Sequence, residues 1–149
     1  MRRARVFIAI GFAAFVFLGL SALLARALTG AGTERSEVLE LVEAQAAGDA
    51  EAALEQLPAC RSQPACVTVM RDRVEQLRRP GEVEILTYRP SVQVALTNRS
   101  GVGRVAWRAG GSAPLVQCVR VRREGPLTGA DVELLAISAP IGGDESCAT

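Results

Sequence analysis

The chain contains no histidine and no lysine, and aromatic side chains are scarce after its first 17 residues. All 17 basic residues are arginine, the four Phe lie within residues 7–17, and there is one Trp and one Tyr. Without His, most of the usual catalytic and metal-binding arrangements are excluded. Stacking platforms for nucleic-acid bases are missing too. The sequence therefore predicts no enzyme, no metal or other cofactor and no nucleic-acid partner.

Charge is distributed unevenly along the 149 residues, a length that suits one domain. Residues 1–26 carry four Arg and no acid, whereas the remainder carries 13 Arg and 16 acids, a net charge of −3. Within that remainder, residues 34–57 have a net charge of −6 and residues 83–123 one of +6. The pattern indicates an acidic helical part and a basic sheet that neutralise each other within one fold.

The N-terminal segment contains a run of 20 residues without charge, Val6–Ala25. About 20 apolar residues span a bilayer as a helix, so the run predicts a single-pass transmembrane anchor. Arg2, Arg3 and Arg5 before it predict a cytoplasmic N-terminus. A cleaved signal peptide is the alternative, because Ala25-Arg26-Ala27 fits a cleavage site loosely. Both readings place the rest of the chain outside the cytoplasm, and the first localises the protein to the cell membrane.

The organisation that follows has three parts. Residues 1–26 form the Arg flank and the anchor or signal peptide, residues 27–33 form a small-residue linker, and residues 34–149 form the extracytoplasmic domain.

Four cysteines fit an exported domain, where an even count predicts disulfides. Three pairings are open, and we favour the sequential one, Cys60–Cys66 and Cys118–Cys147. It would clamp a short loop between helices and tie the C-terminal tail to a strand. The spacing is not that of a zinc site.

The first half of the domain has the periodicity of helices. Apolar residues at Val38, Leu41, Val42 and Ala46 recur at helical spacing after a cap at Thr33. Gly48 is a plausible stop, and residues 49–57 predict a second helix that begins at an Asp cap and ends before Pro58. The third helix is expected over 64–79. Its apolar stripe consists of Val67, Met70, Val74 and Leu77.

After residue 81 the pattern changes to that of strands. We expect strands over 83–88, 92–97, 102–108, 115–123 and 131–138, joined by short turns. Connections of hairpin length imply an antiparallel sheet. The predicted fold class is α+β: an N-terminal transmembrane helix, then three helices packed on a curved antiparallel sheet of about five strands.

The stretch EVLELVEAQAAGDAEAALEQL, with Gly48-Asp49 between its two helices, is followed by a further helix and a curved sheet. In this respect residues 34–140 resemble the nuclear-transport-factor-2-like (cystatin-like) superfamily, and its small, membrane-anchored, exported bacterial members in particular. The resemblance implies a cone-shaped sheet wrapped on helices, with room for a pocket inside. It implies no reaction, because the fold hosts enzymes, binders and dimerisation modules.

The strand pair 102–108 and 115–123 predicts one apolar and one basic face. An antiparallel register in which opposite residue numbers sum to an even value near 224 puts Val105 and Trp107 on the face of Leu115, Val119 and Val121. The other face then carries Cys118 and an arginine row. This row consists of Arg104, Arg108, Arg120 and Arg122. It is either a solvated face or a surface for an anionic partner such as lipid headgroups.

Two functions fit these features. The first is a non-catalytic, membrane-tethered interaction or structural module of the cell envelope, whose partners are its own membrane and an envelope protein or anionic lipid. The alternative is a tethered domain that binds a small apolar or lipid-like ligand in the cone. A filled core favours the first, and an apolar pocket with a few convergent polar groups favours the second.

Overall fold

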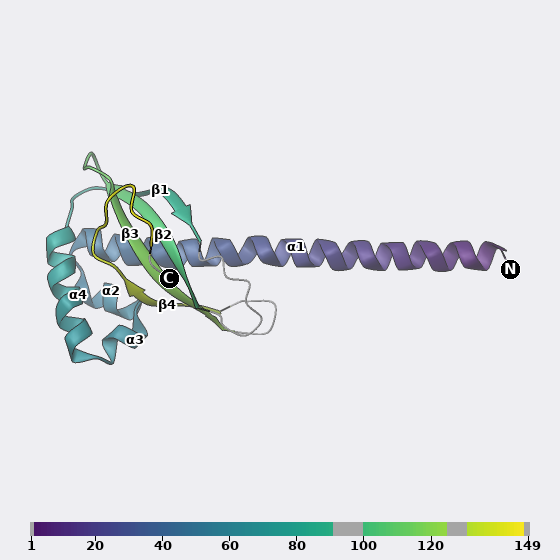
Figure 1. Ribbon diagram of the computed structural model, residues 1–149, viewed down its shortest axis with the longest axis horizontal. Helices are drawn as coiled ribbons and strands as arrows, with labels where there is room; N and C mark the ends of the chain where they lie inside the picture. Colours follow the sequence, from purple (N-terminus) through teal and green to yellow (C-terminus); the bar gives the residue numbers. More distant parts are fainter. Residues whose placement is uncertain (1, 91–99, 125–130, 148–149) are drawn as a thin grey trace.

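The computed structural model describes residues 2–90, 100–124 and 131–147. In these residues four helices precede four strands (Figure 1). The α+β class and the antiparallel sheet are confirmed. The elements are α1 (Arg2–Ala47), α2 (Ala50–Glu55), α3 (Pro58–Arg61), α4 (Pro64–Leu77), β1 (Val83–Arg89), β2 (Ser100–Ala109), β3 (Leu115–Glu124) and β4 (Asp131–Ile137).

The sheet has the order β1-β2-β3-β4, and each strand is antiparallel to the next. The strand predicted over 92–97 lies outside the described residues. Figure 1 shows the strands crossing α1 obliquely, with α2, α3 and α4 gathered at the C-terminal end of α1. The helices therefore cover one face of the sheet, and α1 continues far beyond it towards the N-terminus.

The predicted transmembrane anchor requires correction. Among the described residues, no helix has an apolar stretch long enough to cross a membrane. The N-terminal segment is not a separate element but the first part of a 46-residue helix that ends inside the domain.

The linker predicted over 27–33 is also part of α1, and Thr33 therefore lies inside a helix instead of capping one. Ala and Leu in this segment favour a helix, and each Gly costs only about 1 kcal/mol relative to Ala. The buried turns that follow residue 33 supply the packing that continues the helix through this segment.

The junction between α1 and α2 is formed as the sequence predicts. The amide of Gly48 donates to the Gln45 carbonyl at 3.2 Å, and the amide of Asp49 donates to the Ala44 carbonyl at 2.9 Å. This pattern needs a left-handed residue, and Gly48 has φ +80°. The Asp49 side chain accepts from the amide of Ala52 at 3.0 Å and caps α2. The second helix ends at Glu55, two residues earlier than expected, and Pro58 begins the short α3, which the pattern does not predict.

The core lies between α1, the smaller helices and the inner face of the sheet. The predicted stripe of α1 is buried throughout, and in α4 Met70, Val74 and Leu77 are buried while Val67 is partly buried. The largest fully buried side chain is Trp107, near the end of β2 and between Ile85 of β1 and Leu115 of β3. The predicted packing stripes are thus confirmed.

The register of β2 and β3 confirms the predicted faces. Trp107 lies opposite Leu115 and Gly103 opposite Val119, so opposite residue numbers sum to 222, which is even like the expected value. Val105, Val119 and Val121 are buried on the inner face. The arginine row and Cys118 lie on the outer face.

Candidate functional site

The arginine row is held largely by partners within the chain. Arg108 donates to a carboxylate oxygen of Glu84 at 2.9 and 2.7 Å, and Arg122 forms an ion pair with Glu133. Arg104 donates to the carbonyl of Gly143 in the C-terminal tail, whereas Arg120 is exposed. Neighbouring strands and the tail thus occupy three of the four guanidinium groups. An anionic partner for this row stays a prediction.

The two disulfides pair as predicted. Cys60–Cys66 joins α3 to α4, and Cys118–Cys147 fixes the tail to the outer face of β3, with Cα–Cα distances of 5.3 and 5.7 Å. The tail also pairs with β3 through Val116 and Ile141. All four cysteines are oxidised, as is typical of an extracytoplasmic compartment.

A buried carboxylate lies where α1 enters the domain. Glu34 has no exposed surface, and its two oxygens accept from Tyr88 of β1 and from Arg123 of β3. Burial raises the pKa of Tyr88, and so does its hydrogen bond to Glu34. Gly103 leaves the necessary room, because a Cβ there would lie 3.3 Å from both the Glu34 and the Tyr88 oxygens. This cluster fixes α1 to two strands of the sheet.

A second polar group crosses the centre of the core. The indole of Trp107 donates to Gln117 at 2.8 Å, and the Gln117 amide donates to Gln45 at 3.2 Å and to the Ser138 carbonyl at 2.9 Å. Gln45 and Gln117 are both fully buried. These side chains occupy the space between α1 and the sheet in which a ligand of a cone-shaped fold would lie.

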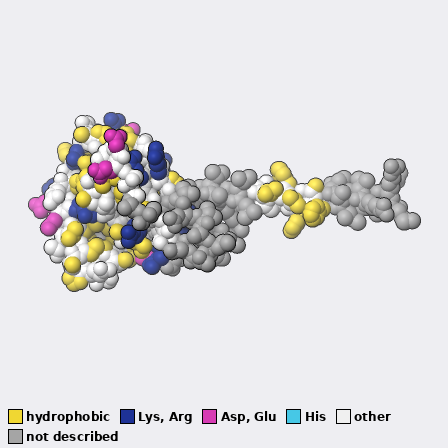
Figure 2. All heavy atoms as spheres, in the orientation of Figure 1, with side chains coloured by type: hydrophobic (Ala, Val, Ile, Leu, Met, Phe, Trp, Pro, Cys, Tyr) yellow, Lys and Arg dark blue, Asp and Glu magenta, His cyan; other side chains and the backbone are white. Residues whose placement is uncertain are grey.

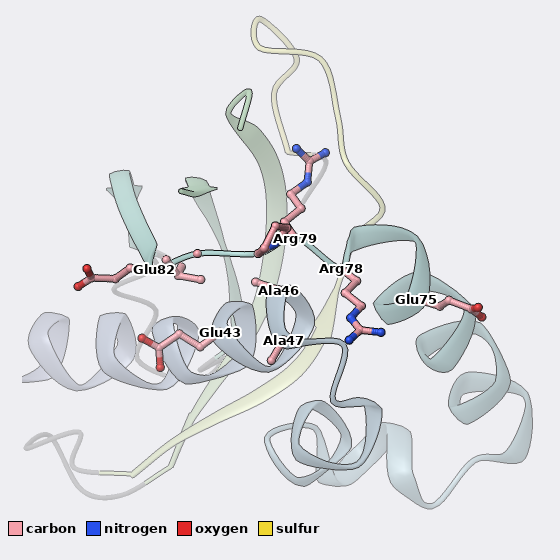
Figure 3. A pocket seen from close by; sticks show the side chains of 10 residues that line it. Glu43, Ala46, Ala47, Glu75, Arg78, Arg79 and Glu82 are labelled. Carbon is pink, nitrogen blue, oxygen red and sulfur yellow. The ribbon is translucent and has the colours of Figure 1, made fainter. Parts of the chain in front are cut away.

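A hollow of about 760 Å³ lies beside the C-terminal ends of α1 and α4. Figure 3 shows Arg78 and Arg79 pointing in different directions, with Glu43 and Glu82 pointing away from both. Catalysis requires polar groups that converge on one reacting atom, and these do not. The stem of Arg78 instead covers Gly48 at the end of α1. No group of three metal-ligating side chains occurs in the residues that the structure describes.

The polar core residues were not predicted, although the sequence holds a signal for them. Glu34 and Gln45 fall on the same helical stripe as Val38, Leu41 and Val42. Gln117 alternates with Val119 and Val121 on the inner face of β3. A polar residue on an apolar face is the local sign of such a cluster. The partners themselves are 54 to 89 residues away from Glu34 and leave no local mark.

Comparisons with protein-family models, with curated proteins and with solved structures found no match to this chain. The resemblance to the nuclear-transport-factor-2-like superfamily therefore stays a prediction, and the function is argued from the geometry of the chain itself.

Proposed function

We propose that this chain is a non-catalytic interaction module that works outside the cytoplasm and assembles with further copies of itself through the projecting part of α1. The observation that carries the proposal is the contrast along this one helix. Its C-terminal part is buried in the core, whereas residues 11–22 are exposed and uncharged. Figure 2 shows an apolar patch on the projecting helix.

The exposed side chains are large and point in every direction around the helix. Phe12, Phe15 and Phe17 are 70%, 77% and 69% exposed, and Leu18 and Leu20 are exposed as well. A helix that is apolar on all sides is normally covered on all sides, and large apolar patches mark interaction surfaces. A second copy offers the same uncharged surface, and symmetric self-association is the commonest assembly of soluble chains.

Two further observations support a module without catalysis. The buried polar groups are used in structural bonds: Glu34 binds Tyr88 and Arg123, and Gln117 binds Trp107 and Ser138. Trp107 and its buried neighbours lie on the inner face of the sheet, which favours an interaction module over the alternative of a ligand held between the helices and the sheet. A small molecule retained in a native mass spectrum of the oxidised chain would favour that alternative.

Sedimentation of the full oxidised chain tests the proposal. We expect a concentration-dependent oligomer, and a monomer when Phe12, Phe15 and Leu18 are all changed to Ser. The matched control changes Val69 and Leu86, two large exposed apolar residues of the body, to Ser and should leave the oligomer intact. A monomeric wild type, or an oligomer that survives the triple change, contradicts self-association. An enzymatic turnover that is lost in Glu34→Gln would contradict the absence of catalysis.

A further inference from the structure

A groove of about 370 Å³ lies between the α3–α4 pair and the end of β4. Its floor consists of the buried Leu57, Cys60, Met70 and Ile137, and the exposed Ala65 and Val69 form its rim. The Cys60–Cys66 disulfide holds one wall in place by joining the two helices. The volume is in the range of small-molecule pockets, which are mostly apolar with a few placed polar groups.

Arg73 of α4 is the one charged residue among the described residues that line this groove. It is partly buried, and burial lowers the pKa of its guanidinium. One of its nitrogens, Nη1, donates to the Ile137 carbonyl. A guanidinium has five N–H donors, so this bond leaves most of its donor capacity unused.

No ion pair to Arg73 occurs among the residues that the structure describes. The residues three and four positions away on α4 are Val69, Met70, Gln76 and Leu77, so no carboxylate is in helical pairing distance. Among the described ion pairs, the neighbouring Arg71 binds Glu51 at 2.7 Å, and Glu133 of β4 binds Arg122. The other acid of β4, Asp131, begins the strand opposite Glu124, at the end away from Ile137. Arg73 thus carries a partly desolvated charge in an apolar groove, which is costly without a partner.

We propose that this groove binds an aliphatic monocarboxylate. The carboxylate would accept two parallel N–H bonds from Arg73, the geometry in which guanidinium groups bind carboxylates best. The aliphatic tail would lie on Met70 and cover Val69 and Ala65 at the rim. This site is lined by α3, α4 and the end of β4 and is separate from the exposed part of α1, so it does not depend on the proposed self-association.

Decanoate, below its micelle concentration, is the probe. The chain has two Met, and the methyl group of Met70 reports on the groove by NMR when methionine is isotopically labelled. We expect a saturable shift of this resonance with decanoate and a weaker one with decanol, which has the tail but no charge. Because the signal comes from the groove, binding of the probe to the projecting part of α1 does not confuse the result.

Two variants and one control decide the assignment. Arg73→Gln should weaken decanoate binding about tenfold or more, as expected for a hydrogen-bonded charge. Arg71→Gln removes an arginine of the same helix outside the groove and should leave binding unchanged. Ala65→Leu fills the rim without touching Arg73 and should also weaken binding; it keeps the test valid if Arg73→Gln does not fold, which Trp107 fluorescence will show.

Three results would overturn the proposal. The first is a Met70 resonance that decanoate does not move. The second is equal affinity for decanol and decanoate. The third is tighter binding of acetyl-leucine than of decanoate, which would assign the groove to the C-terminus of a peptide.

Discussion

The two ends of α1 belong to one helix but have different surroundings. In residues 34–47 the apolar side chains recur at helical spacing, and charged residues separate them. In residues 11–22 apolar side chains occupy nearly every position, and all of them are exposed. A periodic stripe indicates a helix that its own domain covers on one side. An apolar surface without a period indicates a helix whose cover comes from outside the domain. The comparison shows that hydrophobicity alone does not tell where a helix is buried.

The largest expected effect compares the same substitution at the two ends. Leu41 has no exposed surface, whereas Leu18 is 66% exposed. Leu41→Ala removes buried methyl groups and leaves a cavity, so we expect it to lower the free energy of unfolding by about 2–5 kcal/mol. Leu18→Ala should change it by less than about 0.5 kcal/mol. Chemical denaturation followed by the fluorescence of Trp107 measures both.

This prediction separates folding from assembly. If both Leu18→Ala and Leu41→Ala destabilised the domain to a similar degree, the projecting part of α1 would be packed in solution. Measuring the stability loss at several protein concentrations distinguishes packing against another copy from packing within one chain, because only packing against another copy depends on protein concentration.

The sequence predicted the parts of the fold that depend on local pattern. The α1 and α4 stripes, the Asp49 cap, the inner face of β2 and β3 and both disulfides follow from spacing or from the exported context. The continuous helix through residues 27–33 was missed, because Gly-rich segments read as linkers and only packing elsewhere keeps them helical. The burial of Glu34 was not predicted either, because it depends on Arg123, which is distant in sequence.

The junction between the two ends of α1 gives the second prediction. Tyr88 donates to the buried Glu34, and its raised pKa means that the folded state holds the phenol proton more tightly than the unfolded chain. The protonated Tyr88 therefore adds to the free energy of unfolding. This stabilisation is fully present below pH 10, the ordinary Tyr pKa, and decreases as the pH rises above it. Above pH 10 the free energy of unfolding should decrease with a slope that approaches about 1.4 kcal/mol per pH unit. Unfolding curves at increasing alkaline pH measure it.

The composition makes this slope easy to read. The chain has one Tyr and no Lys, and all four cysteines are in disulfides, so few other groups titrate in this range. Tyr88→Phe should remove the alkaline slope and cost about 1–3 kcal/mol at neutral pH, because Glu34 loses a buried donor. A slope that persists in Tyr88→Phe, or a tyrosinate absorbance that appears before unfolding, would contradict the assigned role of this cluster.

The smallest effect comes from one substitution made at two glycines of the same region. Gly32 is an exposed helical residue, and a Cβ there would meet nothing within 4 Å. Gly32→Ala should therefore stabilise the chain by about 0.5–1 kcal/mol, since alanine loses less backbone entropy in a helix. At Gly48 the sign reverses, because φ is +80° and a Cβ would lie 2.8 Å from Cδ of Arg78. Gly48→Ala should lower the free energy of unfolding by about 1 kcal/mol or more.

Amide exchange over residues 32–47 would localise both changes. Opposite signs for the two substitutions are expected only if α1 continues through Gly32 and stops at Gly48. Destabilisation by Gly32→Ala would mean that the two ends of α1 are joined by a bend and not by one helix.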